Sequence, residues 1–63
     1  MNKGDRVLIL EGEQKDEVGY VEQHIGSLIE VRVMLKTGGE SKYVYDHHQL
    51  KMISTAEWRA KRL

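Results

Sequence analysis

The sequence contains no cysteine, so it offers no disulfide, no thiolate nucleophile and no cysteine-ligated zinc site. It also lacks an apolar run of the length that crosses a membrane, and its first residues do not form a signal-peptide pattern. From these absences we expect a cytoplasmic protein that has no membrane partner.

The chain also has no net charge, because ten lysines and arginines balance ten aspartates and glutamates. The charges are nevertheless segregated. Residues 1–31 carry seven acidic and three basic side chains, whereas residues 32–63 carry three acidic and seven basic ones. Nucleic-acid binders usually present a net basic surface. We therefore expect any nucleic-acid binding to use the basic C-terminal half, and the segregation also favours docking to a protein partner.

The chain has no recognisable catalytic motif. There is no phosphate-binding loop, no nucleophile–base arrangement and no paired set of carboxylates in a plausible cleft. His47 and His48 are adjacent, and neighbouring side chains on an extended chain point apart, so they are poorly placed to share a metal ion. We predict no enzymatic activity, no cofactor and no metal site.

Short apolar or alternating segments separated by turn signals predict a small all-β domain. The pair Gly38–Gly39 predicts a two-residue hairpin turn, because glycine tolerates the positive φ angles of such turns. Residues 46–49 predict one turn of 3₁₀ helix. The expected strands are residues 6–10, 18–24, 28–36, 41–45 and 50–53.

A glycine pattern near the N-terminus adds a resemblance. It reads Gly-Asp-x-Val-x-Ile-x-x-Gly, then six residues, then Gly-x-Val. This spacing resembles the KOW motif, which opens small SH3-like barrels in transcription elongation factors and in some large-subunit ribosomal proteins. The resemblance implies a five-stranded SH3-like barrel over about residues 3–53. The matching residues are Gly4, Asp5, Val7, Ile9, Gly12, Gly19 and Val21.

Two parts of this N-terminal stretch have consequences of their own. Gly19 lies inside a predicted strand, where glycine is unfavourable unless a neighbouring backbone comes close. We therefore expect Gly19 to be required by the shape of the fold. The loop Glu11–Glu17 carries four acids and one lysine, whereas the corresponding loop of RNA-binding KOW proteins tends to be basic. This difference argues against extending RNA binding to this chain.

The C-terminal residues predict a short helix over about residues 55–62. Ser54 and Glu57 have the spacing of a capping box, in which each side chain accepts a hydrogen bond from the other residue's backbone. Trp58 and Arg62 lie on one face of this helix. Two alternatives stay open for Trp58: it packs on the barrel, or it serves as an exposed anchor for a partner.

The alternation of the strands predicts how they pair. A three-residue loop, Ile25–Ser27, places Val21 opposite Val31 and Gly19 opposite Val33, which gathers the apolar side chains on one face. The turn at Gly38–Gly39 places Arg32 opposite Tyr45. The residues predicted to be buried together are Val7, Ile9, Val21, Val31, Val33, Val44, Leu50 and Ile53.

This pairing brings all three tyrosines to the solvent side of the sheet. Tyrosine and arginine are enriched at binding hot spots, and an apolar patch on a small sheet requires a cover. The cover is the C-terminal helix, a second copy of the chain or another partner. The predicted binding residues are Tyr20, Arg32, Met34, Tyr43 and Tyr45 on the sheet, with Trp58 and Arg62 on the helix.

Three functions follow, in order of preference. The first is a non-catalytic module for protein interaction, assembly or regulation, encoded by a bacterium or a phage, with a protein partner or self-association. The second is a KOW-like, nucleic-acid-associated module of the transcription or translation machinery. The third is an oligomeric enzyme similar to type II dihydrofolate reductase, because Ser41–Tyr45 is similar in placement to a strand of that family. Tyr43 stands where that family has its substrate-contacting glutamine, so reductase activity is not expected.

Overall fold

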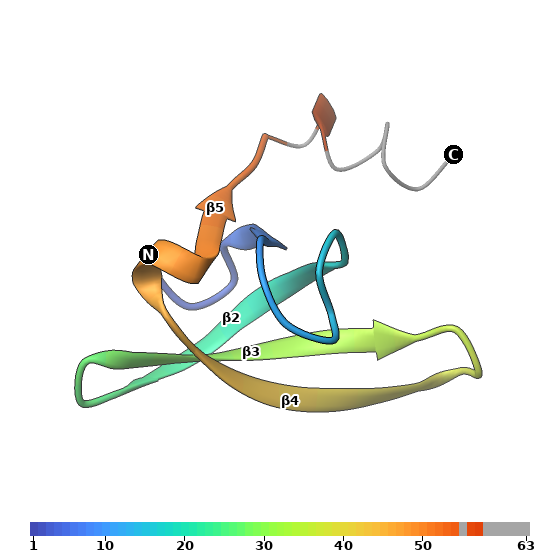
Figure 1. Cartoon of the computed structure of the whole chain (residues 1–63), viewed down its shortest axis with the longest axis horizontal. Helices are drawn as coiled ribbons and strands as arrows, with labels where there is room; N and C mark the ends of the chain where they lie inside the picture. The colour runs from blue at the N-terminus through green and yellow to red at the C-terminus, as the bar shows by residue number, and fades with distance from the viewer. Residues whose placement is uncertain (55, 58–63) are drawn as a thin grey trace.

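A computed structural model describes residues 1–54 and 56–57, and it shows an all-β chain (Figure 1). Its strands form one antiparallel sheet with the order β4-β3-β2-β1-β5. The five predicted strands and the 3₁₀ turn are confirmed, with ends that shift by one or two residues. The elements are β1 (Arg6–Ile9), β2 (Val18–Ile25), β3 (Leu28–Leu35), β4 (Gly39–Asp46), the 3₁₀ turn η1 (His47–Gln49) and β5 (Leu50–Met52).

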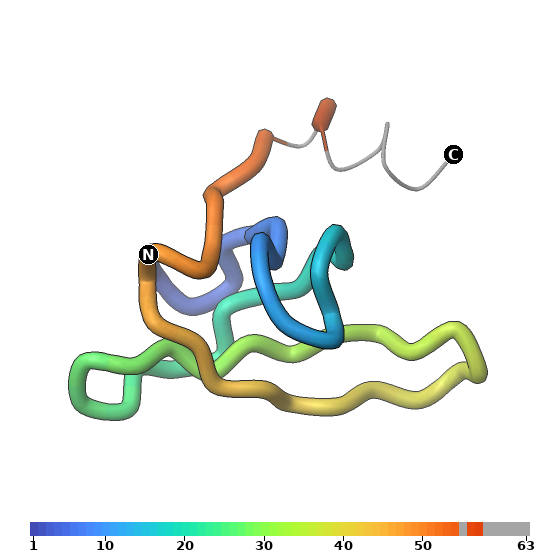
Figure 2. Tube along the Cα trace, in the orientation of Figure 1, coloured from blue at the N-terminus to red at the C-terminus, as the bar shows by residue number. Residues whose placement is uncertain are grey.

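The sheet is strongly bent. β4 and β5 are its two edge strands, so four strand spacings, or about 19 Å, would separate them in a flat sheet. The chain connects them through η1 alone, and four residue steps of 3₁₀ helix advance only about 8 Å. The sheet must therefore curl, and β1 and β5 are seen above the long strands in Figure 1, with the connection traced in Figure 2. The sheet remains open, because β4 and β5 are not paired with each other.

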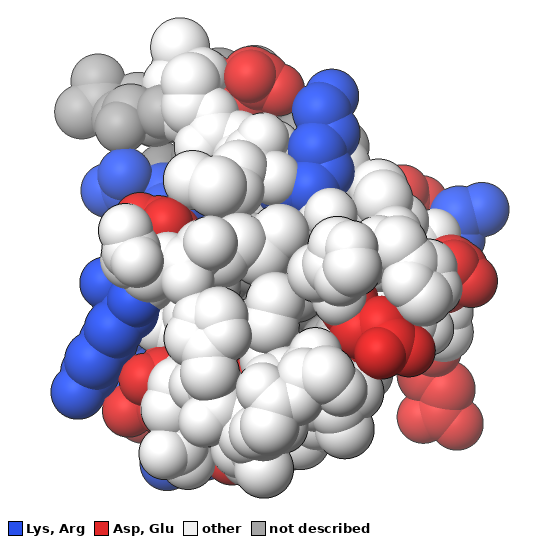
Figure 3. Space-filling model, turned by 90° about the vertical axis from the view of Figure 1, so that its left-hand side faces the viewer, with Lys and Arg blue, Asp and Glu red and all other residues white. Residues whose placement is uncertain are grey.

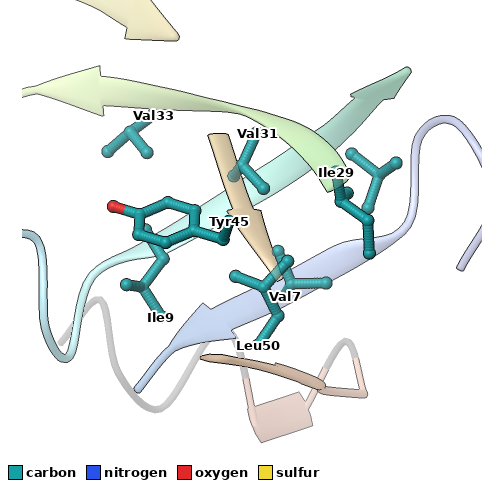
Figure 4. Packing of buried hydrophobic residues seen from close by; sticks show 8 residues of the cluster. Val7, Ile9, Ile29, Val31, Val33, Tyr45 and Leu50 are labelled. Atoms are coloured by element: carbon teal, nitrogen blue, oxygen red, sulfur yellow. The ribbon is translucent and has the colours of Figure 1, made fainter. Parts of the chain in front are cut away.

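The concave face of the sheet holds the core (Figure 4). Alternate residues of β3 are buried, as its sequence pattern predicts. β1 also buries alternate residues, although its apolar run is continuous and predicted a strand covered on both faces. In the view of Figure 4 the Tyr45 ring lies at one end of the cluster, between Val33 and Ile9. The buried residues are Val7, Ile9, Val21, Ile29, Val31, Val33, Tyr45 and Leu50.

Two of the residues predicted to form the core are not part of it. Val44 is 46% exposed on the opposite face, and Ile53 is only half-buried. Tyr45 and Ile29 take their places in the core. The exchange of Val44 for Tyr45 reverses the two faces of β4, and it follows from the pairing of β4 with β3.

The predicted pairing of β2 with β3 is confirmed at its centre, where Val21 faces Val31 and Gly19 faces Val33. The connection differs, however. Ile25 faces Leu28, so the turn has two residues instead of three, and a β-bulge between Val21 and Gln23 restores the register. A bulge adds one residue to one strand, so the shorter turn and the bulge cancel each other.

The predicted pairing of β3 with β4 is wrong by three residues. Leu35 faces Gly39, so the turn contains Lys36, Thr37 and Gly38 instead of Gly38–Gly39. Gly38 has a φ of +97°, and its N–H donates to the Leu35 carbonyl at 3.1 Å. These are the features of a three-residue hairpin loop that ends in a left-handed glycine. An odd shift moves every side chain of β4 to the other face of the sheet.

The predicted capping box after β5 is confirmed. The Glu57 N–H donates to Ser54 Oγ at 3.1 Å, and the Ser54 N–H donates to Glu57 Oε1 at 3.4 Å. The remainder of the predicted helix, including Trp58 and Arg62, lies outside the described residues.

Candidate functional site

The predicted patch of three tyrosines is wrong, because β4 presents its other face. Tyr43 faces Val31 and Tyr45 faces Ile29, so both rings point toward the core. Tyr20 lies on the convex face, opposite Arg32. The patch is therefore divided between the two faces, and of its sheet residues only Tyr20, Arg32 and Met34 share the convex face.

A row of cationic and aromatic side chains crosses this convex face. The pairing aligns Arg6, Tyr20, Arg32 and Lys42 on four neighbouring strands. The guanidinium carbons of Arg6 and Arg32 lie 6.0 and 5.9 Å from the centroid of the Tyr20 ring. Cation–π contacts at this range stabilise a sheet by about 0.5–1 kcal/mol at exposed sites. The sequence predicted the Tyr20–Arg32 pair and missed Arg6 as a member of the row.

Two neighbouring carboxylates balance the charge of Arg32 in this row. Arg32 Nε lies 3.7 Å from Glu22 Oε2 and 3.5 Å from Glu40 Oε2. Among the described strand residues of the convex face, strand alternation places four basic and four acidic side chains together. They are Arg6, Arg32, Lys42 and Lys51, and Glu22, Glu30, Glu40 and Asp46. A face with this balance does not favour a polyanion such as nucleic acid.

Tyr45 is a core residue and is not an accessible contact. Its ring centroid lies 6.5 Å from that of Tyr43. Burial raises the pKa of the Tyr45 phenol above the ordinary value of 10.0, and the charges of Tyr43 and Glu13 raise it further. A neutral phenol inside the core is consistent with a packing role for Tyr45.

Three exposed apolar side chains gather at one end of the convex face, where β2 turns into β3. Ile25 and Leu28 face each other across this turn, with exposures of 45% and 36%. Leu28 pairs with Asp46 of β4, which places Val44 diagonally beside it. We call Ile25, Leu28 and Val44 the hairpin patch. Figure 3 views the molecule from this end, and uncharged side chains fill the lower part of that view.

The hairpin patch adjoins the free edge of β4. Within residues 1–54 and 56–57, β3 is the only strand that pairs with β4. The Asp46 N–H donates to Gln49 Oε1 at 2.9 Å, so it is not used in the ladder with β3. Because N–H and C=O groups alternate in direction along an antiparallel strand, those of Glu40, Lys42 and Val44 also point away from β3. β4 therefore presents an edge with unused hydrogen-bonding groups.

Sequence reasoning missed the hairpin patch for an identifiable reason. Val44 lies between two tyrosines, so both faces of β4 have apolar residues and alternation alone does not select the buried one. Ile25 was assigned to a loop, although Ile25 and Leu28 flank Gly26–Ser27, a pair typical of two-residue turns.

Residues 1–54 and 56–57 contain neither a metal-binding cluster nor a membrane-spanning helix. No group of three or more His, Cys, Asp and Glu side chains is placed to hold a metal ion there. His47 and His48 were expected to point apart on an extended chain, but both lie in η1, and their rings meet edge to face with centroids 5.9 Å apart. No helix in the described part of the chain has the length and apolar character needed to cross a membrane. The cytoplasmic location stays a prediction.

Comparison of the chain with models of protein families, with curated proteins and with solved structures gives no match. The resemblance to KOW proteins therefore stays a prediction from the seven motif residues. The structure does show how the two ends of that motif meet. The Gly4 N–H donates to the Val21 carbonyl at 2.8 Å, and the Val21 N–H donates to the Asp5 carbonyl at 2.9 Å.

Proposed function

We propose that this chain is a small non-catalytic module of SH3-like type that binds an extended protein segment along β4. One observation carries the proposal: the free edge of β4 lies directly beside the exposed hairpin patch. Extended peptides add to open sheet edges through backbone hydrogen bonds, and they gain specificity from side-chain contacts beside the edge. The edge of β4 offers the backbone hydrogen bonds, and Val44 with Leu28 offers the side-chain contacts.

A nucleic-acid-associated function of the KOW type is the second candidate. It is supported by the stacked row of Arg6, Tyr20 and Arg32, because aromatic and guanidinium groups stack on bases. Glu22 and Glu40 oppose it, since both carboxylates already neutralise Arg32. A reductase is not proposed, because Tyr43 stands at the position of that family's glutamine and packs against the core.

Selection of binders from a random peptide library tests the first candidate. Val44→Pro removes one N–H that points away from β3, and proline is tolerated at such positions of edge strands. We expect the selected peptides to alternate apolar and polar residues and to lose at least tenfold in affinity for Val44→Pro. Lys51→Gln, on the opposite edge strand, is the matched control and should bind the peptides as the wild type does.

A second substitution keeps the result interpretable if proline disturbs the fold. Val44→Lys preserves the backbone and places a charge in the hairpin patch, so it should also weaken binding. The proposal is wrong if the selected peptides bind both Val44 variants as tightly as the wild type, or if labelled RNA binds with a steep salt dependence while no peptide is enriched.

A further inference from the structure

We infer that the segment which pairs with β4 is β4 of a second copy of this chain, in an antiparallel register centred on Val44. This inference rests on the proposed function, since it identifies the partner of the same edge. In the resulting dimer, the open sheets of the two copies join through their β4 strands into one continuous sheet. The hairpin patches of both copies lie on its convex face.

Symmetry restricts the possible registers to a few. Two identical antiparallel strands are related by a two-fold axis perpendicular to the sheet. Residues that face each other point to the same side of a sheet. The axis must therefore pass midway between one residue of β4 and the same residue of the other copy. Each register is therefore defined by one central residue of β4.

Charge selects among these registers. With Lys42 at the centre, two lysines face each other. With Tyr43 at the centre, Glu40 faces the Asp46 of the other copy, and this like-charge pair occurs twice. With Val44 at the centre, Lys42 faces Asp46 twice, and opposite charges face each other across the axis. Opposite charges in facing positions stabilise strand pairs, and like charges destabilise them.

Two further registers are less favourable for other reasons. With Ser41 at the centre, Glu40 faces Lys42, but Glu40 already lies 3.5 Å from Arg32. That register also leaves Val44 outside the contact between the central residues. With Tyr45 at the centre, Lys42 faces His48, which belongs to the 3₁₀ turn and is not in extended conformation.

The register centred on Val44 also uses the apolar side chains. Val44 is 46% exposed in the single chain, and in the dimer it packs against its own copy. Leu28 lies diagonally beside Val44 on the neighbouring strand, so each copy adds one leucine to this contact. The exposed hairpin patches thereby become one apolar strip across the two-fold axis.

The backbone groups are directed correctly for this register. The N–H and C=O groups of Val44 point away from β3 and can form two hydrogen bonds with the other Val44. The Lys42 N–H can donate to the Asp46 carbonyl of the other copy, again twice. The Asp46 N–H already donates to Gln49, so the pairing ends where η1 begins.

The interface is small, which predicts weak association. Stable complexes bury about 1,200–2,000 Å² in total, and the contact here involves a few residues of each β4 and one neighbouring strand. We therefore expect a monomer–dimer equilibrium that is visible by sedimentation only as the protein concentration approaches about 1 mM. Lys42→Glu, which places like charges opposite Asp46, should weaken association at least tenfold.

Single cysteine substitutions test the register directly, because the natural chain has no cysteine. In the proposed dimer the two Val44 Cα atoms are about 5.5 Å apart, which is within the range of disulfides. The two Lys42 Cα atoms are separated by four residues along the strands, or about 13 Å. Val44→Cys should therefore form at least tenfold more covalent dimer than Lys42→Cys in a glutathione redox buffer. Both side chains are exposed in the single chain. Because Lys42→Cys also removes the charge pair with Asp46, it is compared with Val44→Cys in a Lys42→Ser background, which lacks the same pair.

The two proposals fail in different ways. Equal cross-linking of the two cysteine variants, together with wild-type sedimentation as a monomer at about 1 mM, overturns the dimer. Peptide binding that depends on Val44 would then still support the binding module, with a foreign segment as the partner. More cross-linking of Lys42→Cys than of Val44→Cys overturns the proposed register. Preferential cross-linking of Val44→Cys that disappears in urea supports it.

Discussion

Replacing Gly19 by alanine is expected to destabilise this chain, although alanine usually suits a strand better than glycine. A Cβ atom at position 19 lies 2.5 Å from Val31 Cγ1, 2.8 Å from the Arg32 carbonyl oxygen and 3.2 Å from Val33 Cγ2. Two of these three contacts are too short for any real Cβ atom. At this point β3 lies too close to β2 to leave room for a side chain on residue 19.

The size of the effect follows from which neighbour can move. Carbon atoms in favourable contact are about 3.5–4.0 Å apart, so the Val31 methyl group must retreat by about 1 Å. Val31 is fully buried and β-branched, which leaves it little freedom to rotate. Overpacking of this kind costs about 1–3 kcal/mol. The opposing gain, from the lower entropy of unfolded alanine, is about 0.4–1 kcal/mol, so the clash dominates.

Urea denaturation measures the outcome. At about 0.05–0.15 kcal/mol per residue, 63 residues give a stability of about 3–9 kcal/mol, and Gly19→Ala should remove a large part of it. The urea midpoint should fall with an unchanged m-value, and Tm should fall by about 5 °C or more. Gly39→Ala is the control, because no atom lies within 4 Å of its added Cβ and its φ is not left-handed. A Gly19→Ala variant as stable as Gly39→Ala would refute the close approach of β3 to Gly19.

Two other predictions concern the core. Val33→Asp should abolish the cooperative melt followed by circular dichroism, because an unpaired charge at a side chain that is 1% exposed costs several kcal/mol; a near-native melt would contradict the strand assignment. The pKa of the Tyr45 phenol is higher in the folded chain than in the unfolded chain. The neutral phenol therefore contributes stability that is fully present below pH 10.0, the ordinary pKa of tyrosine. This stability is lost as the pH rises through the folded-state pKa. Urea midpoints measured across this alkaline range should therefore fall less steeply with pH for Tyr45→Phe than for the wild type, and equal slopes would show that Tyr45 is not the responsible group.

The parts of the fold that sequence predicted well are those where only one arrangement buries the apolar residues. In β3, Ile29, Val31 and Val33 alternate with charged or exposed residues, so their face is unambiguous. This face fixes the pairing with β2 even though the predicted turn was one residue too long. The bulge near Glu22 was not predictable, because it compensates for the turn and leaves the central pairs unchanged.

The candidate site was predicted poorly because it depends on β4, whose two faces are nearly equivalent in sequence. Burying Tyr43 and Tyr45 leaves Val44 outside, and burying Val44 leaves the tyrosines outside. The Gly38–Gly39 pair favoured the second arrangement through a two-residue turn. The larger area buried by two tyrosines, and the left-handed Gly38 in a three-residue loop, favour the first. A local turn preference was thus outweighed by packing.

The two edges of the sheet differ in a way that favours β4 over β5 for the proposed pairing with another strand. β5 has three residues, and a short edge strand offers too few hydrogen bonds to template another chain. β4 has eight residues, and its pairing with β3 shows no bulge that would twist it away from a partner. Its charged residues Glu40, Lys42 and Asp46 discourage random pairing, yet Lys42 and Asp46 have the spacing that matches a second copy. An edge that is long, regular and selectively charged is suited to one chosen strand.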